Sequence, residues 1–162
     1  LWNSTHRGMC PKGLSYDGLW GMTKTYSELL KKIDPKVQVA CGTFWGWTAY
    51  FYSGRDRDLI EQGKGTWKKP VDFAEHGGVP VTKWLLKQLA DQLGYKVREE
   101  RLLREVGYRV RSGSCRVHDQ RLILLDRGLP VNAQIDILAG ELASQSLDSV
   151  YLSPAARRLL RL

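Results

Sequence analysis

The sequence is short of cysteine and has no long apolar run. Its three cysteines, Cys10, Cys41 and Cys115, are irregularly spaced, and no Cys-x-x-Cys pair occurs. This spacing excludes a dense disulfide framework, and we expect the protein to be cytoplasmic, where thiols stay reduced. No apolar run reaches the roughly 18 residues that a transmembrane helix needs, so we expect no membrane span.

The sequence also lacks a complete catalytic or metal-binding motif. Residues 63–66 read Gly-Lys-Gly-Thr, but the spacing of a phosphate-binding loop is missing. Cys115 and His118 would point to opposite faces of a strand, so they form no nucleophile–base pair. We therefore expect no catalytic residue, no metal, no cofactor and a protein that is not an enzyme.

What is present is the composition of a globular protein. The chain has 162 residues, of which 43% are hydrophobic and 26% are charged. These fractions exclude a disordered tail and a collagen-like fibre. The chain is long enough for one hydrophobic core or for two small ones.

The positive charge of the chain is dominated by arginine in the second half. The formal net charge is +8, and no lysine follows Lys96. Arginine forms planar bidentate pairs with phosphate or carboxylate groups, whereas lysine does not. The candidate anion-binding residues are Arg98, Arg101, Arg104, Arg109, Arg111, Arg116 and Arg121. Interleaved acidic residues offer these arginines ion pairs within the chain, which competes with nucleic-acid binding.

Aromatic residues are concentrated between positions 43 and 52. This segment holds more large aromatic side chains than one face of a sheet can bury, so both faces need cover. Contact with a protein partner is favoured over stacking of single-stranded nucleic acid, which is the alternative. The candidate contact residues, including two from an N-terminal arm, are Trp2, Trp20, Phe44, Trp45, Trp47, Tyr50, Phe51 and Tyr52.

The first half of the chain predicts a small unit made of a helix and a hairpin. Residues 1–21 have no helical or strand period, and we expect an irregular arm or a non-native extension before Met22. A capping box at Thr25 and Glu28 predicts a helix that ends at Asp34. The elements expected after it are strands at 37–43 and 47–52 and a short helix at 55–62, which complete an α+β unit over 22–63.

The second half predicts a separate α+β domain over 81–162, after a Gly- and Pro-rich linker over 64–80. Thr82 is expected to cap the strongest helix, and Gly94 to end it. The elements expected after that helix are a strand at 95–103, a hairpin of 108–117 with 121–126, a helix at 131–144 with core residues Ile135, Leu138 and Leu142, and a short helix capped by Ser153.

One segment of the second half resembles a known family. Residues 121–144 read RLILLDRGLPVNAQIDILAGELAS, a strand, a turn and a helix. In order and spacing, residues 80–145 resemble the zinc-peptidase family typified by ImmA and IrrE, whose helix carries HExxH. Gly140 and Ser144 stand where that motif has its zinc-binding histidines, and Glu141 alone remains. The resemblance implies a degenerate, metal-free relative, a pseudo-metallopeptidase.

These observations together predict a non-enzymatic interaction protein or the accessory subunit of a larger assembly. The aromatic hairpin and the N-terminal arm would dock onto a protein partner. The main alternative is a basic nucleic-acid-binding module that uses the arginines and the aromatic hairpin. A further alternative is an enzyme of unrecognised type that uses Glu141, His118 or Cys115. The oligomeric state, the partner and the placement of the two halves stay open.

Overall fold

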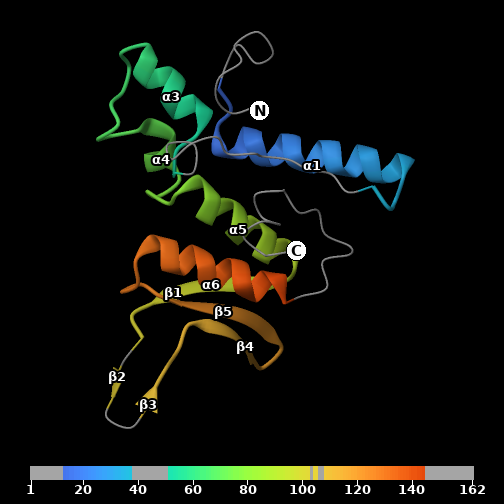
Figure 1. The fold of residues 1–162 in the computed structure, drawn as a ribbon, viewed down its shortest axis with the longest axis vertical. Helices are drawn as coiled ribbons and strands as arrows, with labels where there is room; N and C mark the ends of the chain where they lie inside the picture. The colour runs from blue at the N-terminus through green and yellow to red at the C-terminus, as the bar shows by residue number, and fades with distance from the viewer. Residues whose placement is uncertain (1–12, 38–50, 103, 106–107, 145–162) are drawn as a thin grey trace. The chain divides into compact units, whose positions relative to one another are not determined.

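The protein has an α+β fold of helices and a small three-stranded sheet (Figure 1). The computed structural model describes residues 13–37, 51–102, 104–105 and 108–144. The chain divides into two compact units, and the division falls between Leu85 and Leu86. In the described parts of the chain, no helix is both long enough and apolar enough to span a membrane.

The first helix begins well before the predicted position. Helix α1 covers Tyr16–Ile33, and its N-cap is Ser15, whose hydroxyl accepts the N–H of Gly18 at 3.1 Å. The capping box predicted at Thr25 and Glu28 is therefore wrong, because both residues lie inside the helix. Part of the segment that we expected to be an irregular arm is thus helical.

The end of α1 is confirmed at Asp34, but its predicted apolar face is not buried. Ile33 is 83% exposed, and Tyr26, Leu29 and Leu30 are exposed as well. The hydrophobic cluster of this unit lies instead around the first turns of α1, where Tyr16 and Leu19 pack with Val81. The buried residues of α1 are Tyr16, Leu19, Thr23 and Ser27.

Among the described residues of the first unit, helices α3, α4 and α5 begin after α1. Helix α3 (Gly54–Glu61) confirms the short helix predicted near 55–62, and Ser53 caps it. Helix α4 (Val71–Glu75) lies inside the Gly- and Pro-rich segment, directly after Pro70. Helix α5 (Val81–Gln92) confirms the strongest predicted helix.

The ends of α5 differ slightly from the prediction. Thr82 lies within the helix, where it is buried, and does not cap it. Gly94 follows the helix with φ +76°, the left-handed conformation that favours glycine after a helix end.

The second unit contains the sheet. Strands β1 (Tyr95–Glu100), β5 (Gln120–Asp126) and β4 (Gly113–Val117) are ordered β1-β5-β4. The antiparallel β4–β5 hairpin is as predicted, whereas the parallel pairing of β1 with β5 has no local signal in the sequence. Strand β4 is shorter than predicted because β3 (Tyr108–Arg109) pairs with β2 (Arg104–Glu105) in a separate ribbon.

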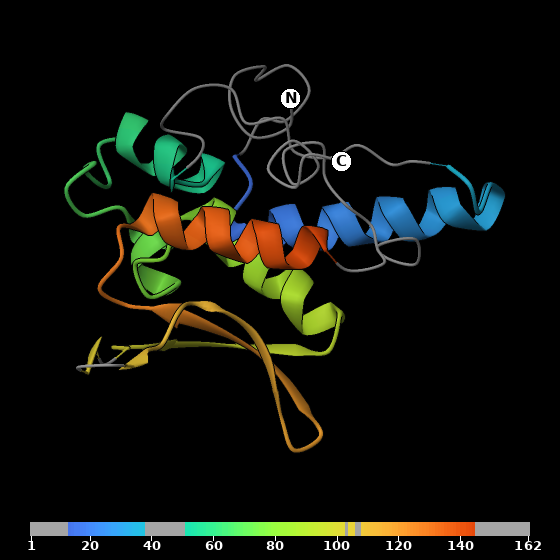
Figure 2. The same cartoon turned by 60° about the horizontal axis from the view of Figure 1, so that its bottom comes forward.

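Helix α6 (Val131–Ala143) follows β5 and lies along one face of the sheet (Figure 2). Its predicted core positions, Ile135, Leu138 and Leu142, are fully buried. Leu122, Ile123 and Leu125 of β5 are buried as well, so alternation along β5 does not separate an inner face from an outer one.

Some predicted elements lie outside the described residues. These are most of the strands predicted at 37–43 and 47–52, and the short final helix predicted to be capped by Ser153. Phe51 and Tyr52, expected at the end of the second strand, are described and lie just before α3 rather than in a strand.

Candidate functional site

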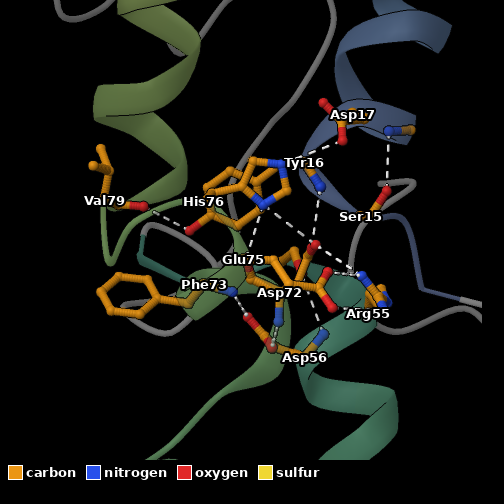
Figure 3. Close-up of polar contacts among 12 residues, drawn as sticks. Ser15, Tyr16, Asp17, Arg55, Asp56, Asp72, Phe73, Glu75, His76 and Val79 are labelled. Atoms are coloured by element: carbon orange, nitrogen blue, oxygen red, sulfur yellow. Dashed lines mark hydrogen bonds and ion pairs between the residues drawn. The ribbon is translucent and has the colours of Figure 1, made fainter.

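A buried carboxylate on α4, that of Asp72, links α4 to two other described parts of the first unit. It has no solvent exposure. One oxygen accepts the N–H of Tyr16 at 3.1 Å, and the other is 3.2 Å from the Arg55 guanidinium (Figure 3). Tyr16 is the first residue of α1, so this carboxylate satisfies a backbone donor that the helix itself leaves unpaired.

A second buried carboxylate, on α3, does the same for α4. Asp56 accepts the N–H of Asp72 at 2.7 Å and that of Phe73 at 3.0 Å. The N-cap residue of α4 is Pro70, which makes no side-chain cap hydrogen bond, so Asp56 takes the role of a capping residue from another helix. Burial raises the pKa of Asp56, and the two N–H donors oppose that rise.

An imidazole fills the space between α4 and the start of α1. The His76 ring stacks on the Tyr16 ring, with centroids 4.4 Å apart and planes 10° apart, and meets Trp84 edge-on at 5.4 Å. Nδ1 of His76 lies 2.8 Å from the Asp72 carbonyl oxygen, and Nε2 lies 3.3 Å from the Asp17 carboxylate. Both partners accept hydrogen bonds only, so this geometry fits the doubly protonated ring.

The pKa of His76 agrees with that geometry. Burial lowers the pKa of the imidazole. The hydrogen bonds to the Asp72 carbonyl and to Asp17, and the negative charges of both carboxylates, raise the pKa and outweigh burial. The net direction is upward. The stacked phenol beside it is also perturbed: burial, together with Asp56 and Asp72, raises the pKa of Tyr16 above its usual range.

The solvent side of the network is an ion pair. Arg55 contacts Glu75 through both terminal nitrogens, at 2.5 and 3.4 Å, while also reaching Asp72. The side chains of Arg55 and Glu75 are 41% and 49% exposed, so their pairing contributes at most about 1 kcal/mol. Arg55 therefore chiefly neutralises the buried charge of Asp72.

This arrangement holds helix ends together rather than presenting a reactive group. Asp56 and Asp72 have both oxygens engaged with protein donors and no exposed surface. In the described ranges, no group of three or more His, Cys, Asp or Glu side chains is placed to hold a metal ion. Sequence reasoning missed both carboxylates; the available signal was a helix that starts after Pro70 without a capping side chain of its own.

The aromatic residues predicted to form a docking surface are only partly described. Trp20 is half-buried on α1. Tyr52 packs between Trp67 and Phe73, each with ring centroids 5.3 Å away, and Phe51 lies 6.4 Å from Tyr52. The remaining predicted residues, Trp2, Phe44, Trp45, Trp47 and Tyr50, lie outside the described residues.

Four of the seven predicted arginines occupy directly opposite positions in the strand registers. Arg116 lies opposite Arg121, and Arg104 lies opposite Arg109. Arg116 donates to the His118 carbonyl and to Asp119 within its own turn. The Arg121 guanidinium lies 5.7 Å from the centre of the Tyr95 ring. Arg98, Arg101 and Arg111 are exposed.

The three residues of the supposed peptidase motif lie at the end of α6. Gly140 is exposed, and Ser144 is the C-cap residue, whose hydroxyl donates to the Glu141 carbonyl at 2.7 Å. The Glu141 side chain is half-buried and faces Gly113 of β4, where an added Cβ would lie 3.3 Å from the carboxylate.

Comparison with known proteins identifies the family. The model of glycoside hydrolase family 44 matches residues 1–106, and the chain belongs to this family. The matched range contains the whole network around Asp72. It also overlaps the first part of the segment that resembles a zinc peptidase.

One solved structure is similar to part of the chain. It is described as the crystal structure of CelM2, a bifunctional glucanase-xylanase protein from a metagenome library. The identity is 31% and the TM-score is 0.48, and the similarity covers 55% of this chain and 17% of that chain. The chain thus spans about a sixth of the length of that protein. No curated protein matches the chain.

The family assignment corrects several predictions. The resemblance to ImmA and IrrE, and with it the pseudo-metallopeptidase, is wrong, because the family match covers residues 1–106 and points to a glycosidase. The prediction of a non-enzymatic interaction protein or accessory subunit is also wrong, as is the prediction that the protein is not an enzyme. The nucleic-acid-binding alternative gains no support.

Proposed function

We propose that the protein acts in the hydrolysis of glycosidic bonds in a polysaccharide. The observation that carries this proposal is the match to glycoside hydrolase family 44 over residues 1–106. Glycoside hydrolysis generally uses two carboxyl groups, one as an acid and one as a base or nucleophile, on either side of the scissile bond.

Asp56 and Asp72 are not proposed as that pair. A catalytic carboxyl group must reach the glycosidic oxygen or the anomeric carbon. Both groups are fully buried, and either carboxylate would leave the helix end that it caps without an acceptor if it turned toward a substrate. We assign them a positioning role, in which they fix the ends of α1 and α4 and so the surface that these helices carry.

The test is release of reducing ends by the purified 162-residue chain from a panel of soluble glucans, xylans and mannans. The expected result is a time-dependent rise with at least one polysaccharide. If no reducing ends appear from any of them while circular dichroism shows a folded chain, the proposal is contradicted.

A destabilised variant separates this activity from a contaminating glycosidase. Asp56→Ala should unfold at a lower temperature than the unaltered chain because it loses a buried cap. The temperature at which activity disappears should fall by the same amount. An activity whose thermal profile is identical in both preparations belongs to a contaminant, and the proposal then fails.

A further inference from the structure

Trp67 is a large aromatic side chain held at the surface of the first unit. It is 43% exposed. It occupies a tight turn between α3 and α4, closed by a bridge between Thr66 and Lys69 in which the Lys69 N–H donates to the Thr66 carbonyl at 2.9 Å. The turn places the indole beside the helices rather than on a long loose loop.

The indole is supported by other rings. The Tyr52 ring lies 5.3 Å away at an angle of 49°, and Tyr52 itself packs against Phe73 of α4 at 5.3 Å. Phe73 in turn donates its N–H to Asp56. The exposed ring therefore packs against a cluster of tilted and edge-on aromatic rings, one of which belongs to a residue that Asp56 holds, and binding a ligand to it requires little further ordering.

We infer that Trp67 is a stacking platform for a pyranose ring of the polysaccharide. One face of a pyranose presents C–H groups with partial positive charge, and the face of an indole carries negative charge density, so the two attract as they exclude water. The choice of ligand rests on the proposed glycosidase function. The residues next to Trp67, Thr66 and Lys68, are exposed and carry donors that sugar hydroxyls accept.

Among the described residues of this unit, a further exposed apolar surface lies on α1 and is mostly aliphatic. On α1, Tyr26 lies among aliphatic residues that include Leu29 and Ile33, at helical spacing. Branched aliphatic side chains offer no flat face for a sugar. Ile33, which is 83% exposed, therefore provides a matched control for the loss of exposed apolar surface.

The experiment is affinity electrophoresis of the full chain in native gels that contain a neutral polysaccharide, either hydroxyethyl cellulose or galactomannan. Neutral polymers are required because a chain of net charge +8 would be retained by any polyanion. The unaltered chain should be retarded in proportion to the polysaccharide concentration. Trp67→Ala should bind about tenfold more weakly, Trp67→Phe about threefold more weakly, and Ile33→Ala like the unaltered chain.

Two results overturn the inference. One is no retardation of the unaltered chain by either polymer, and the other is equal retardation of the unaltered chain and Trp67→Ala. The reducing-end assay, run in parallel, separates the two proposals. If retardation depends on Trp67 but no reducing ends are released, only the glycosidase function is refuted. If reducing ends are released but Trp67→Ala is retarded as strongly as the unaltered chain, only the stacking platform is refuted.

Discussion

Replacing Asp56 with alanine tests the claim that one helix caps another. The substitution leaves the N–H groups of Asp72 and Phe73 without the acceptor that now lies at 2.7 and 3.0 Å. Asp56 is fully buried, so water does not reach these donors unless the helix ends separate. An unpaired buried donor costs about 1–3 kcal/mol, and loss of an N-cap side chain costs about 0.5–2 kcal/mol.

The expected loss is smaller than the sum of two full penalties. Burial raises the pKa of Asp56, which means that the ionised carboxylate is itself destabilised in the folded protein, and removing it relieves that penalty. We expect Asp56→Ala to lower the free energy of unfolding by about 2–4 kcal/mol. Asp56→Asn keeps one accepting oxygen without the charge, so it should cost about half as much.

Urea unfolding followed by tryptophan fluorescence measures this difference. With a denaturant dependence of about 1–3 kcal/mol per molar urea, a loss of about 3 kcal/mol lowers the midpoint by about 1–3 M. Asp136→Ala, an exposed acidic position on α6, should change the unfolding free energy by less than about 0.5 kcal/mol. A change within that same margin for Asp56→Ala, or equal changes for the alanine and asparagine variants, would show that Asp56 does not cap α4.

Two further predictions concern a titrating group and two glycines. His76→Phe should lower the free energy of unfolding most below the ordinary imidazole pKa of 6.5, because the folded protein binds the imidazole proton more tightly than the unfolded chain does. The loss should shrink as the pH rises through the raised pKa of the folded state. A loss that urea titrations find constant from pH 5.5 to 8.5 contradicts this. Gly94→Ala should lower the free energy of unfolding by about 1–2 kcal/mol because φ at this position is +76°. Gly21 is exposed on α1 with open space around it, so Gly21→Ala should raise that free energy by about 0.5–1 kcal/mol. Thermal melts that shift both variants in the same direction would be inconsistent with these backbone conformations.

The elements that could be predicted from the sequence are those whose buried residues pack against a neighbouring segment of the chain, so that the local pattern of apolar residues reports the burial. The core positions of α6 were predictable because leucine and isoleucine recur at helical spacing in a segment that packs against the adjoining strand β5. Gly94 marked the end of α5 for a similarly local reason, since the left-handed conformation excludes most other residues.

Helix α1 could not be predicted correctly because its apolar stripe and its buried face are different. The helical spacing of apolar residues predicts that Leu29 and Ile33 are buried, but both are exposed. Burial of Tyr16 and Leu19 depends on Val81, more than sixty residues away in the chain, so no local pattern reports it. Ser27 is polar, yet it is buried because its hydroxyl donates to the Thr23 carbonyl of the preceding turn.

The polar network was missed for the same physical reason. A carboxylate that caps its own helix has a recognisable spacing, but Asp72 and Tyr16 are 56 residues apart, and Asp56 caps a helix to which it does not belong. Single residues such as Asp72 carry no sign of this in the sequence. The motif that carried the resemblance to a zinc peptidase, residues 121–144, lies outside the range that the family model matches, so it held no sign of the family.

The nested caps also couple the motions of three helices. Asp56 on α3 holds the start of α4, and Asp72 on α4 holds the start of α1. We expect opening of the start of α4 to expose the amide hydrogens of Asp72 and Phe73 to exchange, and that of Tyr16 with them. Loss of the cap at α4 would therefore also displace the carboxylate that caps α1, whereas loss of the cap at α1 would leave α4 capped.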